Sequence, residues 1–188
     1  MFSSISRLVE CFSVWRIEPR GDLSEGDIVI TQAASATADG PGPMNELIAQ
    51  VALEIARKYG IPIAAQGEVA DLLVFVNDVD VYSSPTQREQ KTLGLRHLDS
   101  RDMALWHKGV CDALGCKRPI LVTYQPHLVR VLWVTEKCAF SNIIVPFVPS
   151  ATGKHYAKGA EYWWASFQYI ASFREFCGRM LFWMCSWI

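Results

Sequence analysis

Short apolar runs that alternate with stretches of helical period constrain the fold of this chain more than any other feature. The first run, Asp27 to Thr31, precedes a stretch in which apolar residues recur every three or four positions up to Tyr59. Gly60 ends that stretch, and a second apolar run follows at 61–65. Strand, helix and returning strand form a βαβ unit, whose two strands pair in parallel.

The second half of the chain continues the alternation. Apolar positions within 101–114 predict a helix with Asp99 or Ser100 as its cap and Gly115 just beyond its end. Residues 120–123 form the clearest strand of the sequence.

The strand at 120–123 is followed by a second helix start. Pro126 has a backbone angle suited to the first helical position, which predicts Gln125 as the cap and a helix to about Ala139. Further runs predict strands at 72–76 and 143–148, whereas the polar, turn-prone stretch 77–92 predicts an irregular segment.

Together these elements predict an α/β protein with a three-layer, Rossmann-like fold: a mainly parallel sheet with helices on both faces. A length of 188 residues favours one domain over 1–188. Residues 1–25 form an N-terminal extension in this interpretation, and 155–188 a helical C-terminal region rich in aromatic side chains.

Charge and hydropathy exclude several classes of function. Eighteen basic and nineteen acidic residues nearly cancel, and no stretch concentrates one sign, so we expect no nucleic-acid partner. Arg7, Glu10 and Arg16 interrupt the apolar N-terminus, which argues against a signal peptide and predicts a cytoplasmic protein. The apolar stretch 176–188 is too short to cross a bilayer. Core packing is expected there, with homodimer contact or peripheral membrane contact as alternatives.

Cysteine and histidine spacing predicts no metal site. None of the six cysteines forms a Cys-x-x-Cys pair, and we expect reduced thiols in apolar surroundings. His97 and His107 lie near acidic residues, but at no spacing that gathers metal ligands.

The expected ligand site lies where the strand 120–123 leads into the next helix, since open α/β sheets bind ligands at the carboxyl ends of their strands. Thr123, Gln125, His127 and Arg130 follow that strand closely. The planar fork of Arg130 suits phosphate or carboxylate, and His127 is a candidate acid or base. A surface histidine beside an ordinary arginine ion pair is the structural alternative.

Other loops at the same edge add candidates for ligand binding. They are Gln32 after the first strand, Gln66 and Gly67 after the second, and Ser100 and Asp102 at the start of a helix. Helix capping explains Ser100 and Asp102 equally well. The glycines at 40 and 42 do not form a dinucleotide fingerprint, because the third glycine is absent and prolines remove backbone donors.

The segment Ile120-Leu-Val-Thr-Tyr-Gln-Pro-His127-Leu-Val-Arg130 resembles the strand, turn and His-x-x-Arg helix start of a bacterial family of Rossmann-like domains of unknown function, typified by the YdcF, SanA and ElyC proteins. The resemblance covers roughly residues 26–188. It implies a parallel sheet with a polar pocket at its carboxyl edge and a role in the cell envelope or in binding small metabolites. Asp102 and Met103 stand where the family has Asn and Thr, and Gln66-Gly67-Glu68 where it has Ser-Gly-Gly.

Two functions are compatible with this sequence. The first is binding of a small anionic metabolite or a nucleotide-like cofactor such as S-adenosylmethionine, with hydrolase or transferase chemistry that uses His127. The second is a non-catalytic regulatory or protein-interaction module, which the departures from the family pattern and the apolar C-terminus favour.

Overall fold

The computed structural model describes residues 17–34, 36–37, 40–96 and 98–148, together with Cys177 and Met180. In chain order the elements are η1 (Leu23–Glu25), β1 (Ile28–Thr31), β2 (Ala36–Thr37), β3 (Gly40–Pro41), α2 (Pro43–Tyr59), β4 (Ile63–Ala65), α3 (Gly67–Ala70), β5 (Val81–Ser83), α4 (Gln87–Thr92), α5 (Ser100–Leu114), β6 (Pro119–Val122) and α6 (Gln125–Cys138).

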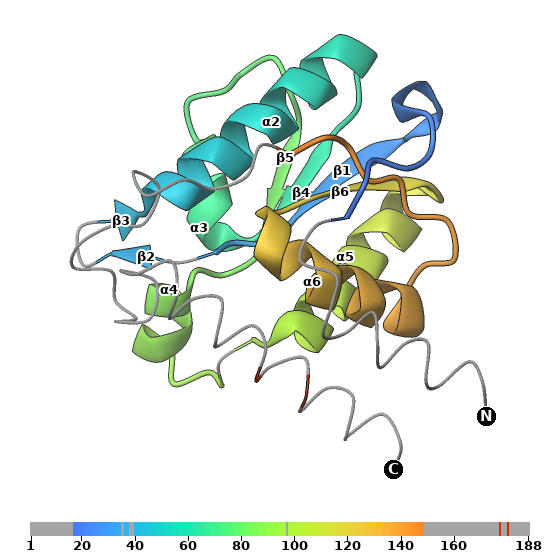
Figure 1. Cartoon of the computed structure of the whole chain (residues 1–188). Coiled ribbons are helices and arrows are strands. Elements are labelled where there is room, and N and C mark those ends of the chain that lie inside the picture. Colours follow the sequence, from blue (N-terminus) through green and yellow to red (C-terminus); the bar gives the residue numbers. More distant parts are fainter. Residues whose placement is uncertain are drawn as a thin grey trace.

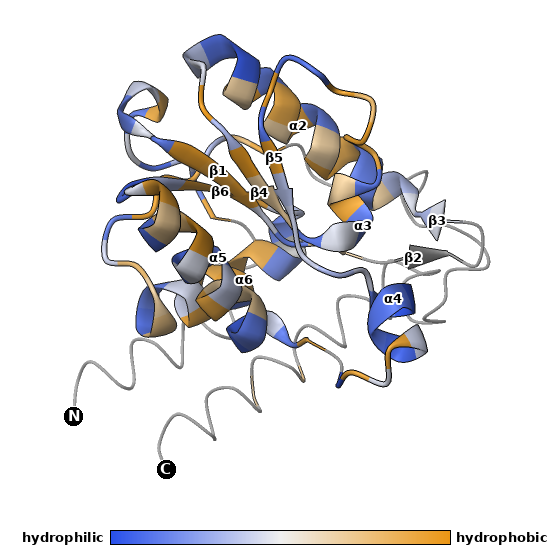
Figure 2. Ribbon diagram, turned by 180° about the vertical axis from the view of Figure 1, so that it is seen from behind, coloured by the Kyte–Doolittle hydropathy of each residue, from blue (hydrophilic) through white to orange (hydrophobic). Residues whose placement is uncertain are grey.

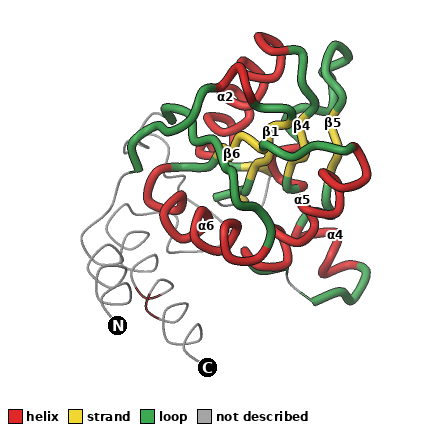
Figure 3. Tube along the Cα trace, turned by 90° about the vertical axis from the view of Figure 1, so that its right-hand side faces the viewer, coloured by secondary structure: helices red, strands yellow, loops and turns green. Residues whose placement is uncertain are grey.

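The central sheet has four parallel strands in the order β5-β4-β1-β6, seen end-on in Figure 3. The chain builds outward from β1 to β4 and β5 on one side, and then crosses back to place β6 on the other side of β1. The direction of winding therefore reverses between β1 and β6. Crevices for ligands in open α/β sheets form at such a reversal, outside the carboxyl ends of the two strands.

Among the residues that the structure describes, the sheet continues beyond β6 only as isolated bridges. Ile144 lies parallel to Ile120, and Val145 pairs with Arg20 in antiparallel fashion. The strand predicted over 143–148 is thus reduced to two bridged residues. The bonds are regular where they occur, with the Leu121 N–H donating to the Ile144 carbonyl at 2.9 Å.

Helices cover both faces of the sheet, which confirms the predicted three-layer α/β fold. Figure 1 shows α2 and α3 on one face and α5 and α6 on the other. All four residues of β1 are buried because successive side chains enter opposite helical layers. Val29 packs in the core beneath α2, whereas Ile28 and Ile30 pack with α5 and α6. Hydrophobic colour accordingly concentrates on the strands and on the helix sides that face them (Figure 2).

The helix boundaries follow the expected end signals closely. Gly60 and Gly115 end α2 and α5 in the left-handed conformation, with φ of 64° and 74°. Asp99 caps α5 and shares a capping box with Asp102. Helix α6 begins one residue earlier than predicted, because Gln125 is its first residue and Tyr124 occupies the cap position.

The predicted strand at 72–76 is wrong. These residues continue from α3 in tight turns, in which Leu73 N–H bonds to the Ala70 carbonyl and Val76 N–H to the Leu73 carbonyl. Val74 and Phe75 are exposed, and Leu73 alone of the five is buried. An apolar run was therefore not enough to identify a strand here, because turns on a protein surface also carry apolar side chains.

The stretch predicted to be irregular contains two elements. Val81–Ser83 is β5, the edge strand that pairs with β4, and Gln87–Thr92 is α4, which Thr86 and Glu89 cap in a complete capping box. The strand was missed because β5 has only three residues at the edge of the sheet, of which Val81 alone is partly buried against the core.

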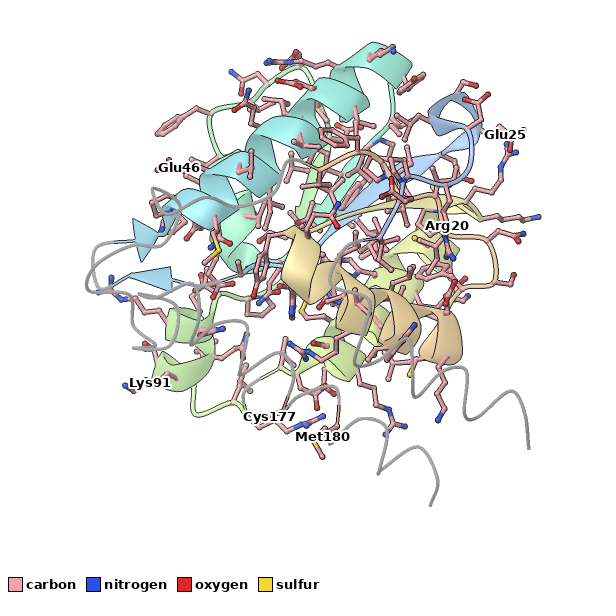
Figure 4. The ribbon with its side chains drawn as sticks, in the orientation of Figure 1. Arg20, Glu25, Glu46, Lys91, Cys177 and Met180 are labelled. Atoms are coloured by element: carbon pink, nitrogen blue, oxygen red, sulfur yellow. The ribbon has the colours of Figure 1, made fainter. Side chains whose placement is uncertain are left out.

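The predictions for the N-terminal extension up to residue 16 and for the C-terminal helix fall outside the described residues, apart from Cys177 and Met180. Both of these are helical, and Figure 4 labels them. Within the described part of the chain, none of the helices has the length and apolar character needed to cross a bilayer.

Candidate functional site

The reversal between β1 and β6 is closed by a buried side-chain hydrogen bond. The Thr123 hydroxyl, just past β6, donates to the Gln32 carbonyl, just past β1, at 2.9 Å. Both residues are buried, so the two strand ends leave the sheet at a fixed separation. Two of the predicted site residues therefore meet where a Rossmann-like sheet places its ligand crevice.

Arg130 lies at this edge and is fixed by two of the other candidates. It lies in the second turn of α6, and its guanidinium donates to the Ser100 hydroxyl at 2.8 Å and contacts Nδ1 of His127 at 2.9 Å. The Gln32 amide reaches the Ser100 carbonyl at 3.5 Å. Ser100 is the first residue of α5, so this polar group joins the starts of α5 and α6 to the end of β1.

The contact with Arg130 determines how His127 is protonated. A guanidinium can only donate, so Nδ1 of His127 must accept and the hydrogen of the neutral ring must sit on Nε2. The ring is buried and stacks on Tyr124, with centroids 5.5 Å apart and planes inclined by 16°. Such a histidine acts as a hydrogen-bond donor. The predicted use of His127 as a general base requires the Arg130 contact to break first.

A second polar group occupies the carboxyl end of β4. Oε1 of Gln66 accepts from the Ala33 N–H at 2.9 Å, and Oδ1 of Asn45 accepts from the Ala34 N–H at 2.8 Å. Both amide side chains are buried. They hold the loop that leaves β1 against β4 and the start of α2. Gln66 was a candidate for ligand binding, and in this structure it positions the loop next to Gln32.

Glu68 belongs to the candidate segment Gln66-Gly67-Glu68, but sequence reasoning did not single it out as a site residue. It lies in α3 immediately after β4, is buried, and accepts the Gln87 N–H on Oε1 at 2.6 Å. Oε2 has no hydrogen-bond partner among the described residues. Burial raises the pKa of the Glu68 carboxyl, and the bond from Gln87 opposes that rise only in part. Its position just after a strand placed it near this edge, but nothing local in the sequence indicates that its side chain is buried.

Gly67 serves the backbone rather than a ligand. A Cβ on this residue would lie 2.5 Å from the Thr86 nitrogen and 2.7 Å from its Cα. The Gly67 N–H donates to the Ser84 hydroxyl at 3.1 Å. Glycine is therefore required where the chain after β5 crosses the end of β4.

Two predicted site residues have contacts that do not involve the polar group at Arg130. The buried Gln125 accepts the Ile17 N–H at 3.1 Å and donates to the Val148 carbonyl at 3.3 Å, so it ties two distant segments together. Asp102 completes the cap of α5 and pairs with Arg96 at 2.5 Å. The capping alternative holds for Asp102.

His107 is buried in α5 and was not predicted as a core residue. It is fully inaccessible, and neither ring nitrogen has a hydrogen-bond partner of normal geometry among the described residues. Burial lowers the pKa of His107 to about 4, while the nearby backbone groups of Ala64 and Thr31 oppose the shift. This histidine therefore stays neutral at physiological pH.

Other reactive groups do not gather at this edge. Burial raises the pKa of the Cys111 thiol to about 12, which leaves it unreactive at neutral pH. In residues 17–148 as far as they are described, no three His, Cys, Asp or Glu side chains lie close enough to share a metal ion.

In Figure 4, Glu46 and Lys91 mark the side of the molecule to which the strands run, and Glu25, just before β1, marks the opposite side.

Comparison with known proteins gives no relative. No protein-family model matches the chain, and neither a curated protein nor a solved structure does.

Proposed function

We propose that this protein binds a small anionic metabolite or a nucleotide-like molecule at the carboxyl edge of its sheet, with Arg130 as the residue that takes the anion. The observation that carries the proposal is the fixed guanidinium of Arg130, held by Ser100 and His127 beside the reversal between β1 and β6. An arginine whose geometry is set in advance loses little side-chain entropy when it binds.

The backbone at the start of α6 supports an anionic ligand. The first N–H groups of a helix lack partners within the helix and carry partial positive charge. Tyr124, the cap residue of α6, makes no side-chain cap bond. Pro126 has no N–H, and the N–H groups of His127 and Leu128 donate to the Tyr124 carbonyl at 3.0 and 2.9 Å. The start of α6 would therefore favour an anion through its partial positive charge, while Arg130 makes the direct contact.

The chemistry that such a site supports is recognition of phosphate or carboxylate. His127 contributes to this recognition by holding the guanidinium of Arg130 through Nδ1. Nucleotides, sugar phosphates and S-adenosylmethionine are the ligand classes to test first, and hydrolysis or group transfer is a further step of the proposal. The resemblance of 120–130 to the YdcF, SanA and ElyC family agrees with a polar pocket at this edge.

The alternative is a non-catalytic interaction module. Phe75 and Val74 favour it, since 91% and 66% of their surfaces are exposed. Adjacent apolar side chains so exposed are common at contact surfaces.

Thermal unfolding against a panel of ligands tests the proposal. The panel contains inorganic phosphate, nucleotides, sugar phosphates and S-adenosylmethionine, and the variants are Arg130→Ala and His127→Ala. At 100 times its dissociation constant, a ligand stabilises the fold by about 2.7 kcal/mol, which is readily detected. We expect at least one compound to raise the melting temperature of the wild type and to lose this effect in Arg130→Ala.

Arg57→Ala is the matched control, because Arg57 is an exposed arginine on α2 that pairs with Asp78. Its ligand response should equal that of the wild type. If no compound shifts the wild type, or if Arg57→Ala abolishes the shift as fully as Arg130→Ala, the anion site is refuted and the interaction module becomes the better explanation.

A further inference from the structure

The segment 85–96, here called the strap, crosses the carboxyl edge of the sheet. It leaves the end of β5 at Ser84 and delivers the chain to Asp99 and Ser100, at the start of α5. Ser100 is the residue that holds Arg130. The strap therefore runs from one end of the row of strands to the candidate site at the reversal. In Figure 1, α4, its only helix, stands off from both helical layers.

The strap is organised mainly by bonds within itself. The side chain of Gln90 donates to the Pro85 carbonyl at 2.9 Å and accepts the N–H of Leu98, just past the strap, at 2.9 Å, so one amide joins the start of the strap to the chain that leaves it. Gln90 is the only buried residue of α4, and it is polar. A segment closed by its own hydrogen bonds can move as a unit, with its bends at the residues that flank it.

Polar contacts attach the strap to the rest of the protein. Oε1 of the buried Glu68 accepts the Gln87 N–H at 2.6 Å, and Arg96 pairs with Asp102 at the other end. The apolar side chains of the strap, Leu93 and Leu95, are 68% and 53% exposed. Segments with few buried apolar contacts open at a lower free energy than the core does.

We propose that the strap is a lid that opens and closes over the carboxyl edge, with the Glu68 carboxylate as its latch. Closure fixes Asp99 and Ser100, and through Ser100 it fixes the guanidinium of Arg130. Opening uncovers the ends of β1 and β4 and releases that constraint. The opening of the strap stands on its own contacts, whereas its role as a gate to the anion site rests on the proposed function.

Hydrogen exchange and limited trypsin digestion test this in the full chain. The strap contains Arg88, Lys91 and Arg96, all exposed, and Lys108 in α5 is the comparison site. We expect trypsin to cut within the strap well before Lys108, and amides of α4 to exchange at least tenfold faster than those of α5. Equal exchange in α4 and α5 would overturn the lid, because the strap would then open only with the whole fold.

Paired variants test the latch. Glu68→Gln keeps an oxygen that accepts the Gln87 N–H, whereas Glu68→Ala removes it. We expect on the order of tenfold faster exchange of α4 in Glu68→Ala, wild-type exchange in Glu68→Gln, and little change in α5. Gln90→Ala, which removes the bonds to Pro85 and Leu98 without touching Glu68, should also accelerate exchange in the strap, with the exposed Gln50→Ala as its control. Unchanged strap exchange in both alanine variants would refute this assignment of the contacts.

Experiments with inorganic phosphate distinguish the lid, which is the opening of the strap, from the gate, which is control of the anion site by the strap. We expect phosphate to slow exchange of the strap in the wild type but not in Arg130→Ala. If phosphate raises the melting temperature without slowing the strap, the gate is wrong and the anion site stands. If phosphate and the rest of the panel leave the melting temperature unchanged, the proposed function fails, and the lid is judged on the phosphate-free exchange alone.

Discussion

The guanidinium of Arg130 reaches back one turn along α6 and donates to Nδ1 of His127 at 2.9 Å. This relationship assigns the ring hydrogen to Nε2 and makes the arginine and histidine a single donor unit. The dependence of Arg130 on His127 can be tested with any compound that binds, whatever its identity.

His127→Phe should weaken anion binding while it preserves the fold. Phenylalanine retains the ring that stacks on Tyr124 but offers Arg130 no acceptor. Loss of one such bond corresponds to roughly 1 kcal/mol, or about a fivefold weaker affinity. Calorimetric titration with the panel compound that gives the largest thermal shift measures this, and His127→Phe with wild-type affinity would show that the histidine does not position Arg130.

Gln125→Ala should destabilise the fold and leave ligand affinity unchanged. The substitution leaves the part-buried Ile17 N–H and the buried Val148 carbonyl without their side-chain partner. The expected loss is about 1–3 kcal/mol of unfolding free energy, measured by urea denaturation. The exposed Gln50→Ala on α2 is the control and should change stability little. If Gln125→Ala binds the ligand more weakly under conditions in which the variant is fully folded, Gln125 belongs to the binding site after all.

Gly67→Ala should be costly, and Gly109→Ala should not. The new Cβ at position 67 would meet the backbone of Thr86 at 2.5 Å, which forces the strap away from the end of β4. We expect a loss of about 1–3 kcal/mol, as for overpacked sites. Gly109 lies within α5, and a Cβ there meets nothing within 4 Å. Alanine at 109 should therefore stabilise the helix by up to about 1 kcal/mol. Equal effects of the two substitutions in denaturant unfolding would contradict the close contact at Thr86.

His107 should make the protein lose stability in mild acid. The unfolded chain takes up a proton near the ordinary pKa of 6.5, but burial lowers the pKa of the folded His107 to about 4. Between these values the unfolded state binds more protons, so stability falls as pH falls, by about 1.4 kcal/mol per pH unit. The total reaches roughly 3 kcal/mol at pH 4.

His107→Leu should remove this part of the pH dependence. The measurement is the difference between wild type and variant in unfolding free energy, at pH 7 and at pH 4, since the difference cancels groups common to both. Glu68 acts in the opposite sense: its raised pKa favours the folded state at low pH, and that contribution is lost as pH rises through the raised value. A wild-type minus variant difference that does not change with pH would show that His107 is accessible to protons in the folded protein.

The parts of the fold that could be predicted are those that a local pattern determines. Strands β1 and β6 are buried on both faces and read as continuous apolar runs, and Gly115 and Asp99 mark the ends of α5 directly. The edge strand β5 could not be found in this way, because it has only three residues, and two of them, Tyr82 and Ser83, are exposed and interrupt any apolar run.

The same distinction between local and distant contacts applies to the candidate site. Thr123, His127 and Arg130 are close in sequence, and the structure keeps them at one edge. The partner of Gln125 is Ile17, which is 108 residues away, so no spacing rule could separate its structural role from a binding role. Glu68 is likewise defined by the strap that folds over it, and a strap attached by polar contacts leaves no periodic pattern in the sequence.

The bridge between Arg20 and Val145 has a consequence for how this protein can be rebuilt. The two backbones exchange hydrogen bonds at 2.9 Å in both directions, so the stretch from 20 to 145 is entered and left at a single point on the edge of the sheet. Because the two ends of this stretch adjoin, it is suited to insertion into a loop of a host protein and to circular permutation with a short linker that joins the two ends.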